Sequence, residues 1–215
     1  MHLKRQKVPS NWPIQRKGTK YIVRANLKLR DGVPILIFLR DMLKIAQNKK
    51  EVKSAIHSKH VLLNDKLIND EKRAVMLFDK ITIIPTDKYY QLSISKNGKF
   101  EAEEIKEIES HQKIAKIINK KTLKHKKTQV NLSDGRNYLS DINCKINDSA
   151  VIDFKKNSII RCLPLKENAK AMIFAGKHTG EIGVANKIEL EKKIMEIDIE
   201  EKRINALIKQ VIVIE

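Results

Sequence analysis

The chain contains few of the residues on which membrane-spanning and aromatic-rich proteins depend. Only 5% of its 215 residues are aromatic, so its cores must be built from Ile, Leu and Val. The longest apolar run, residues 33–39, includes a proline and is far shorter than the roughly twenty residues that cross a bilayer. The basic N-terminus lacks the apolar segment of a secretory signal. We therefore expect neither a membrane partner nor secretion.

Cysteine and histidine are also scarce. The chain has two cysteines, Cys144 and Cys162, and neither has another cysteine close by in sequence. Such low cysteine use is typical of a reducing intracellular compartment, so we expect two buried, unreactive thiols rather than a zinc site or a catalytic thiol. The six histidines are scattered, and none has the i, i+4 pairing of metal ligands. The sequence predicts no metal and no cofactor.

Acidic residues are absent from the first thirty positions. In a chain of formal net charge +18, that segment holds nine Lys and Arg residues, at positions 4, 5, 7, 16, 17, 20, 24, 28 and 30. A solvated face normally mixes both signs, so this segregation favours a polyanion as partner. The segment also lacks an apolar period, and we expect an extended arm that becomes ordered only on RNA. Trp12 is interpreted as an anchor to the protein core, with base stacking as the alternative.

The stretch from residue 33 to residue 68 shows the clearest structural pattern. A first helix is predicted because apolar residues recur at helical spacing, at positions 38, 42, 45 and 46. Asn48 can then cap a second short helix, with Glu51 three residues later as in a capping box. An alternating pattern follows, with a turn at Asn64-Asp65. Basic residues are left off the apolar stripe of this module: Arg40, Lys44, Lys49, Lys50, Lys53 and Lys59.

This stretch resembles the S4-type RNA-binding module, a small fold of ribosomal proteins that docks two helices on structured RNA. The likeness rests on LRDMLKIAQNKKEVKSAI followed by VLLNDKLI. The best-known pattern has glycine where this chain has Asp65, and aspartate is one of the non-glycine residues that best tolerate left-handed backbone angles. The resemblance implies RNA binding and nothing narrower, because the module also occurs on RNA-modifying enzymes.

The middle of the chain is predicted to form short strands joined by tight turns. Three turns carry this interpretation: Asn97-Gly98, Asp134-Gly135 and Lys156-Asn157. Residues 105–119 fit a helix almost as well as an irregular strand. The basic residues between Lys120 and Lys127 are interpreted as a linker or loop. Turns about every dozen residues predict a small barrel or sandwich.

The last motif, AMIFAGKHTGEIGVANKIEL at residues 171–190, has strand character on both sides of a glycine-rich loop. Gly176 and Gly180 allow a tight turn from which Lys177 and His178 project. The motif resembles the KOW motif, a strand–loop–strand of SH3-like barrels that contacts RNA through its loop. A nucleotide-binding loop is excluded, because no Lys-Ser/Thr pair follows the second glycine. The β-branched run at the C-terminal end is expected to supply a closing strand.

Taken in order, these features resemble the archaeal and eukaryotic small-subunit ribosomal protein S4e family over essentially the whole chain. The likeness rests on collinear stretches that include HLKR, RDML, NGKF, VNLSDGRNYL, INDSAVIDF, AGKHTGEIG and IKQVIVIE. The family implies a structural constituent of the small ribosomal subunit that binds ribosomal RNA directly, in the cytoplasm. Its implied partners are small-subunit ribosomal RNA and neighbouring small-subunit ribosomal proteins, with no small-molecule substrate.

The predicted fold is α+β and multi-module. It comprises a basic N-terminal arm, a small two-helix plus hairpin RNA-binding module, a central β-rich domain and a C-terminal SH3-like β-barrel with the KOW motif. The corresponding boundaries are 1–34, 35–86, 87–168 and 169–215. The predicted RNA-binding residues are Lys4, Arg5, Arg16, Lys17, Arg40, Lys44, Lys49, Lys50, Lys53, Lys59, Lys177 and His178.

Two other functional classes are compatible with single parts of the chain. An RNA-modifying enzyme would share the two-helix module but needs a catalytic domain. The acid pairs Glu103-Glu104 and Glu200-Glu201 lie in charged runs, which favours a solvated face, so we predict that the protein is not an enzyme. A KOW-containing transcription elongation or RNA-processing factor would explain the last motif but neither the basic arm nor the two-helix module.

Overall fold

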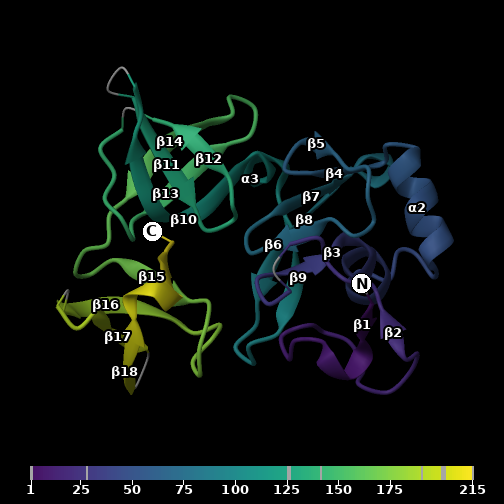
Figure 1. The fold of residues 1–215 in the computed structure, drawn as a ribbon, viewed down its shortest axis with the longest axis horizontal. Coiled ribbons are helices and arrows are strands. Elements are labelled where there is room, and N and C mark those ends of the chain that lie inside the picture. Colours follow the sequence, from purple (N-terminus) through teal and green to yellow (C-terminus); the bar gives the residue numbers. More distant parts are fainter. Residues whose placement is uncertain are drawn as a thin grey trace. The chain divides into compact units, whose positions relative to one another are not determined.

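The computed structural model of the chain describes residues 2–27, 29–124, 127–140, 142–189, 191–199 and 202–214. It is mostly β-structure with a few short helices, which agrees with the predicted α+β class (Figure 1). The chain divides into two compact units: unit 1 is residues 1–94 with 99–111, and unit 2 is residues 95–98 with 112–215. Some sequence predictions fall on residues outside the described ranges, namely Lys28, His125, Lys126 and the Glu200-Glu201 pair.

The helices of unit 1 are short, and those between residues 35 and 57 lie where the sequence predicts two helices. They are α1 (Ile35–Ile37), the π-helical segment η2 (Phe38–Met42), α2 (Lys49–His57) and α3 (Glu107–Ser110). Two 3-10 turns, η1 (Arg5–Lys7) and η3 (Ile84–Thr86), lie in the same unit. α1 and η2 form a continuous helical segment that buries Phe38 and Leu39 completely or nearly so. The predicted first helix is therefore present, but it ends at Met42 rather than at Ala46.

The start of α2 confirms the predicted cap. The side-chain oxygen of Asn48 accepts hydrogen bonds from the N–H groups of Lys50 and Glu51. The Glu51 carboxylate reaches back and accepts from the N–H of Gln47 and from the side-chain amide of Asn48. This exchange satisfies N–H groups that the first helical turn would otherwise leave without a partner.

The described strands of unit 1 form one five-stranded sheet and two strand pairs. They are β1 (Leu3–Lys4), β2 (Tyr21–Ile22), β3 (Gly32–Pro34), β4 (Val61–Leu63), β5 (Lys66–Leu67), β6 (Ala74–Met76), β7 (Lys80–Ile83), β8 (Lys88–Ile94) and β9 (Phe100–Ile105). The sheet has the order β5-β4-β7-β8-β9. Asn64 and Asp65 turn β4 into β5 with φ of 53° and 58°, which confirms that aspartate takes the left-handed angle here.

The sheet of unit 1 crosses a boundary that the sequence analysis drew after residue 86. The whole of β7 pairs with the first half of β8. β8 and β9 form a hairpin whose turn is the predicted Asn97-Gly98. The hairpin assigned to the central part, 87–168, is therefore hydrogen-bonded to the sheet of the two-helix module.

The N-terminal arm packs on unit 1, contrary to the expectation that it orders only on RNA. β1 pairs with β2, and Leu3, Val8 and Trp12 belong to the same apolar cluster as α1 and η2. Trp12 is only 2% exposed, so its prediction as a core anchor is confirmed. The expectation was wrong because the arm uses scattered apolar residues, which lack the period of a helix or strand, to contact a core that lies later in the sequence.

Unit 2 contains two five-stranded antiparallel sheets among its described residues. The first is β12-β11-β10-β13-β14, from β10 (Gln112–Thr122), β11 (Thr128–Leu132), β12 (Asn137–Leu139), β13 (Ser149–Asp153) and β14 (Ser158–Leu163). The second is β18-β17-β16-β15-β19, from β15 (Lys170–Ile173), β16 (Ile182–Glu189), β17 (Ile194–Ile199), β18 (Lys202–Leu207) and β19 (Val211–Val213). The turn η5 (Ile208–Gln210) precedes β19. The predicted C-terminal strand is confirmed, since β19 pairs with β15.

The ambiguous stretch 105–119 resolves mainly into strand. After the single turn of α3, β10 runs for eleven residues and includes Lys120 and Lys121. These two lysines were interpreted as linker residues, and that interpretation is wrong. The reason is that β10 pairs with β13 through its first half and with β11 through its second half, so its pairing depends on residues far along the chain.

The prediction of two free thiols is also wrong. Cys144 and Cys162 form a disulfide, with their Cα atoms 5.9 Å apart. Cys162 lies on β14, whereas Cys144 lies in the segment that leads into β13, and both pack in the core of the first sheet of unit 2. The antiparallel return of β13 and β14 brings them together, which the spacing in sequence did not reveal. The inference of a reducing compartment loses the support that it drew from unpaired thiols.

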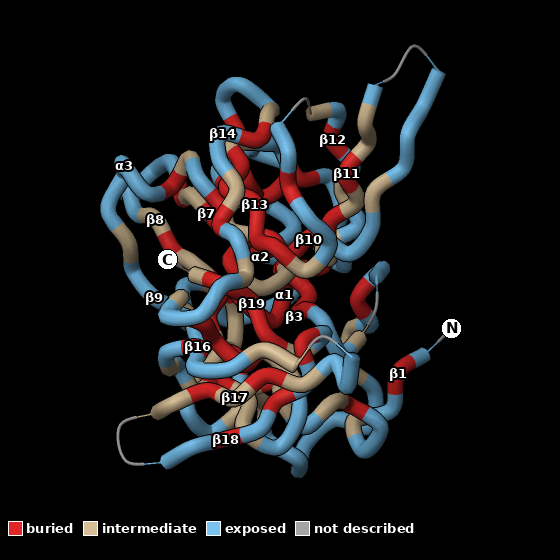
Figure 2. The backbone as a smooth tube through the Cα atoms, turned by 90° about the vertical axis from the view of Figure 1, so that its left-hand side faces the viewer, coloured by how far each residue is buried: buried red, intermediate tan, exposed pale blue. Residues whose placement is uncertain are grey.

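Each sheet system has its own apolar core (Figure 2). Ile, Leu and Val dominate the core of unit 1, as the scarcity of aromatic residues predicts. In unit 2 each of the two sheets has its own cluster, around Ile117 and Ile197, and a third cluster of Val151, Leu163 and Val213 joins the two sheets. Within the described ranges no helix is long and apolar enough to cross a membrane.

Candidate nucleic-acid interface

Helix α2 presents the densest group of predicted RNA-binding residues. Lys49, Lys50 and Lys53 are exposed because the apolar stripe of the helix, Val52 and Ile56, turns into the core. Lys49 and Lys53, one helical turn apart, both reach the carboxylate of Glu71, at 2.9 Å and 3.9 Å. One carboxylate thus offsets part of the charge of two lysines, and the surface around α2 stays net positive.

The two lysines help to lower the pKa of the Glu71 carboxyl. Burial acts to raise the pKa of the Glu71 carboxyl, but hydrogen bonds from Lys49 and from its own backbone, together with the charges of Lys49 and Lys53, outweigh it and lower the pKa. The carboxylate is therefore ionised at neutral pH and holds the two ammonium groups in place. The Glu71 side chain is only 12% exposed, whereas the side chains of Lys49 and Lys53 are 49% and 47% exposed, so both ammonium groups can still reach another anion.

Three further predicted residues flank the two helices. Arg40 lies on η2 and forms a two-point contact with the neighbouring Asp41, at 2.8 Å for the shorter bond. Lys44 follows η2 and Lys59 follows α2, and both are exposed with positive φ of 56° and 59°. Each lysine ends a helical segment in the left-handed conformation, a backbone that glycine or asparagine adopts more readily.

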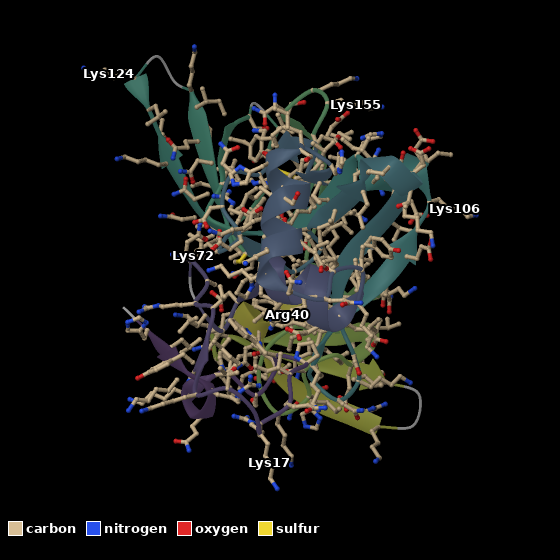
Figure 3. The ribbon with its side chains drawn as sticks, turned by 90° about the vertical axis from the view of Figure 1, so that its right-hand side faces the viewer. Lys17, Arg40, Lys72, Lys106, Lys124 and Lys155 are labelled. Carbon is tan, nitrogen blue, oxygen red and sulfur yellow. A yellow bond between two sulfur atoms is a disulfide. The ribbon has the colours of Figure 1, made fainter. Side chains whose placement is uncertain are left out.

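The arm contributes cations of two kinds. Arg5 serves the fold: its guanidinium donates to the carbonyl oxygens of Gln15 and Thr19, both at 2.7 Å, and to the Thr19 hydroxyl. Lys4 and Lys17 are exposed, and neither has a side-chain partner within the described part of the chain. Figure 3 shows Lys17 extending away from the arm.

Arg16 is exposed and makes a single long hydrogen bond, from its Nη1 to the carbonyl oxygen of Val8 at 3.4 Å. Like Lys4 and Lys17, it therefore keeps most of its donors for another partner. Arg5 differs, since the Gln15 and Thr19 oxygens already occupy its guanidinium donors.

The glycine-rich loop between β15 and β16 carries the last two predicted residues, on unit 2. Gly176 and Gly180 have φ of 105° and 94°, so the predicted need for glycine is confirmed. Lys177 is exposed at the loop, while the Nδ1 of His178 lies 3.1 Å from a carboxylate oxygen of Glu181. The lysine is thus the more available cation of the two.

The twelve predicted residues therefore fall into groups that differ in the partners of their side chains within the protein. Carboxylates lie beside Arg40, Lys49, Lys53 and His178, and backbone oxygens hold Arg5 and, more weakly, Arg16. Six lysines have no side-chain partner among the described residues: Lys4, Lys17, Lys44, Lys50, Lys59 and Lys177. The arm, η2, α2 and the residues that follow the two helices carry ten of the predicted residues, all in unit 1, and the remaining two lie on unit 2.

Two cations that sequence reasoning missed lie beside this group. Lys72 and Arg73 are exposed and follow Glu71 directly, in a segment whose carbonyl oxygens accept the N–H groups of Ile35 and Leu36 at the start of α1. This segment also accepts the N–H of Asn26 from the arm. The signal was the charged run DEKR, which resembles an ordinary solvated loop and so carried no prediction.

A separate group of acids in unit 1 lies on β9. Glu101, Glu103 and Glu104 are exposed on β9, as expected for a solvated face, and only Glu104 has a described ion-pair partner, Lys88 at 4.0 Å. A phosphate backbone would be repelled from this strand and attracted to the arm and α2. Within the described ranges no three His, Cys, Asp or Glu side chains gather as metal ligands would.

Comparison with known proteins identifies the family. The model of the family described as "Ribosomal family S4e" matches residues 86–159, and the model of the RS4NT (NUC023) domain matches residues 1–26. Small ribosomal subunit protein eS4 of Methanothermobacter thermautotrophicus is 34% identical over 90% of this chain and 81% of its own length. The eS4 protein of Nanoarchaeum equitans is 35% identical over 87% of this chain and 82% of its own length.

A solved structure supports the fold. The crystal structure of the 30S ribosomal protein S4e from Thermoplasma acidophilum matches with a TM-score of 0.74 at 21% identity, covering 86% of this chain and 95% of that chain. Fold and matches together define a ribosomal protein of the small-subunit class. The chain belongs to the small ribosomal subunit protein eS4 family, which confirms the resemblance found in the sequence.

Proposed function

We propose that the protein is a structural constituent of the small ribosomal subunit that binds ribosomal RNA directly and thereby supports translation. The observation that carries the proposal is the separation of charge on unit 1. Exposed lysines without carboxylate partners outnumber exposed acids on the arm and around η2 and α2, whereas β9 and α3 carry exposed acids at positions 101, 103, 104, 107 and 109. Folded proteins do not need such separation for stability, but a polyanion partner does.

The contacts proposed here are mainly to phosphates. Lys4, Lys17, Lys44, Lys50 and Lys59 would neutralise phosphate charge, with Arg16, Arg40, Lys49 and Lys53 joining by exchanging their present partners. Contacts of this type fix the orientation of a protein on RNA but carry little sequence information. Selection of one ribosomal RNA site would then depend on RNA shape, as is general for structured RNA.

We further propose that unit 2 contributes through the loop at residues 176–180. The strand–loop–strand form of β15 and β16, and the positive φ of Gly176 and Gly180, support its reading as a KOW motif within an SH3-like barrel. Lys177, with His178 beside it, would then reach RNA or a neighbouring ribosomal protein. The four functional parts at 1–34, 35–86, 87–168 and 169–215 remain part of this proposal, as does a cytoplasmic location in the ribosome.

The transcription elongation or RNA-processing alternative has no observation in its favour. It explains only the loop after β15, while the matched relatives are small ribosomal subunit proteins over most of their length.

The test is sedimentation of the tagged protein from a cell lysate of its native host through a sucrose gradient. We expect it to travel with the small subunit and to stay there after a high-salt wash, as a protein with many RNA contacts does. Travel with RNA polymerase, without ribosomal RNA, would contradict the proposal and support the alternative.

A further inference from the structure

A second basic surface lies on unit 2, outside the residues discussed above. From His111 to Ser133 the sequence contains no Asp or Glu and seven lysines, at positions 113, 116, 120, 121, 124, 126 and 127. These residues belong to β10, β11 and the connection between them. The sequence analysis interpreted part of this run as a linker, so no function was assigned to it.

The first three lysines of this run make contacts that stabilise the fold of unit 2. Lys113 is buried in an ion pair with Asp134, 3.0 Å away. Lys116 is buried and donates to the carbonyl oxygens of Ile208 and Val211. Lys120 donates to the carbonyl oxygen of Cys144. Each of these three charges is thus accounted for by a contact within unit 2.

The outer lysines have no such role. Lys121, Lys124 and Lys127 are exposed, and none has a side-chain partner among the residues that the structure describes. Figure 3 shows Lys124 at the outer end of the β10–β11 pair. The lysines of β10 before Lys121 are bonded within unit 2, whereas those from Lys121 onward have no partner among the described residues. This change indicates that the outer part of the β10–β11 pair faces something other than this protein.

The backbone around these lysines forms a projecting two-stranded ribbon. β13 pairs with β10 only as far as Lys116, and β12 pairs with β11 only from Gln129 onward. β10 and β11 pair further at Lys121 with Gln129 and at Thr122 with Thr128, where the N–H of Ser140 still donates to the carbonyl oxygen of Thr128. Past these pairs the two segments bond only to each other among the described residues, from the N–H of Leu123 to the carbonyl oxygen of Lys127. Figure 2 shows this outer part exposed. The end of a two-stranded ribbon is marginal in water, so contact with a partner would stabilise it.

The register places two of the lysines on one face. Lys121 lies opposite Gln129, and Lys127 directly precedes β11, where its carbonyl oxygen accepts from the N–H of Leu123 and so continues the pairing. Alternation along a strand puts Lys121 and Lys127 on the same side, as diagonal neighbours roughly 7–8 Å apart. The described residues supply no acid to offset their mutual repulsion, which a row of phosphates would remove.

We propose that this ribbon, residues 120–124 and 127–129, is a second RNA-binding element that contacts the phosphate backbone through Lys121, Lys124 and Lys127. The inference rests on the proposed function, because the RNA is taken to be small-subunit ribosomal RNA. A narrow two-stranded element with cations at its end suits insertion between RNA helices, where phosphates approach from more than one side.

The experiment compares the full chain with the variant K121Q/K124Q/K127Q on a transcript of small-subunit ribosomal RNA at several salt concentrations. Loss of three phosphate contacts should flatten the log–log salt dependence of binding by about 2–3 units. The matched control, K88Q/K187Q/K192Q, removes equal charge from lysines that lie beside Glu104 or Glu189, and should change the slope much less. Circular dichroism verifies that both variants fold.

The outcomes separate the two proposals. If the unmodified chain binds the transcript and the ribbon variant keeps its slope and affinity, the ribbon inference is wrong and the proposed function stands. If the unmodified chain does not bind, the proposed function itself fails. A photocrosslinker at Thr122 in assembled subunits gives a second readout: a crosslink to RNA supports the inference, and a crosslink to protein alone overturns it.

Discussion

The indole Nε1–H of Trp12 donates a hydrogen bond to the carbonyl oxygen of Leu29 across 3.0 Å. This bond joins the early part of the basic arm to its end, while the indole ring lies in the apolar core of unit 1. The arm therefore presents its cations from an ordered surface. An ordered arm loses less conformational entropy on binding RNA than a disordered one would.

The first prediction is that Trp12 is shielded in the absence of RNA. Trp12 is the single tryptophan of the chain, so its fluorescence reports on the arm alone. We expect blue-shifted emission and weak quenching by acrylamide in RNA-free protein, because the side chain is 2% exposed. Emission at the wavelength of a solvated indole would instead mean that the arm is disordered until it meets RNA.

The same residue gives a stability test. Trp12→Ala should lower the free energy of unfolding by about 3–5 kcal/mol, the usual cost of removing a large buried aromatic side chain. Tyr21→Ala is the control within the arm, since Tyr21 is 49% exposed and should cost much less. Urea denaturation followed by circular dichroism measures both, and equal small effects would contradict the packed arm.

The parts of the fold that sequence predicted are those that local chemistry decides. Asn48 caps α2 because a side-chain acceptor lies within three residues of the free N–H groups, and Asn64-Asp65 turns because both residues tolerate positive φ. The Cys144–Cys162 disulfide and the pairing of β10 were missed because each depends on strands that meet only in the folded chain.

The same distinction holds for the candidate site: features set by local sequence were predicted, and features that depend on distant residues were not. Exposure of Lys50 follows from helical spacing, which a sequence displays directly. The role of Arg5 does not, because its acceptors on Gln15 and Thr19 come from a loop that folds back over it. The pairing of Lys49 and Lys53 with Glu71 was hidden for the same reason: the acid lies in a different segment.

The second prediction concerns the cap of α2. Asn48→Ala removes the oxygen that accepts from the N–H groups of Lys50 and Glu51, and should lower the free energy of unfolding by about 1 kcal/mol. Asn48→Ser keeps an acceptor at the same place and should restore most of the loss. If both variants match the unmodified chain in urea denaturation, the cap does not stabilise the helix.

The third prediction compares two glycines that both have positive φ. Gly135, at 83°, has open space where a Cβ would lie, so Gly135→Ala should cost about 1 kcal/mol of backbone strain. Gly180, at 94°, would place a Cβ 2.0 Å from the carbonyl oxygen of Ser95, so Gly180→Ala must also displace backbone.

Thermal unfolding of the two variants measures the difference. We expect a clearly lower midpoint for Gly180→Ala than for Gly135→Ala. Equal midpoints would mean that the loop at residues 176–180 yields freely, and would remove the steric reason for glycine at position 180.

The fourth prediction concerns Lys116. Burial lowers the pKa of its ammonium group from the ordinary 10.5 to about 8. Between about pH 8 and 10.5 the unfolded chain therefore holds a proton at Lys116 that the folded chain has released, so the stability of the folded state rises with pH in that window. Below pH 8 both states are protonated and the contribution is constant.

Comparison with Lys116→Met isolates this effect. The free energy of unfolding of the unmodified chain, minus that of the variant, should increase from pH 8 to pH 10 by at most about 1.4 kcal/mol per pH unit. Lys121→Met, at an exposed position on the same strand, controls for the loss of one lysine. Parallel pH curves for Lys116→Met and the unmodified chain would mean that the buried amine titrates normally.

The central claim is that exposed cations of the arm and the two-helix module bind ribosomal RNA. The most direct test is the salt dependence of binding to a small-subunit ribosomal RNA transcript for K4Q/K17Q/K44Q/K50Q, with E101Q/E103Q on β9 as the control surface. If these four lysines contact phosphates, the log–log slope should fall by about 3–4 units in the lysine variant, since each phosphate contact contributes roughly 0.7–0.9. The glutamate variant should lose no affinity. An unchanged slope in a lysine variant that folds normally would mean that these cations do not bind the RNA.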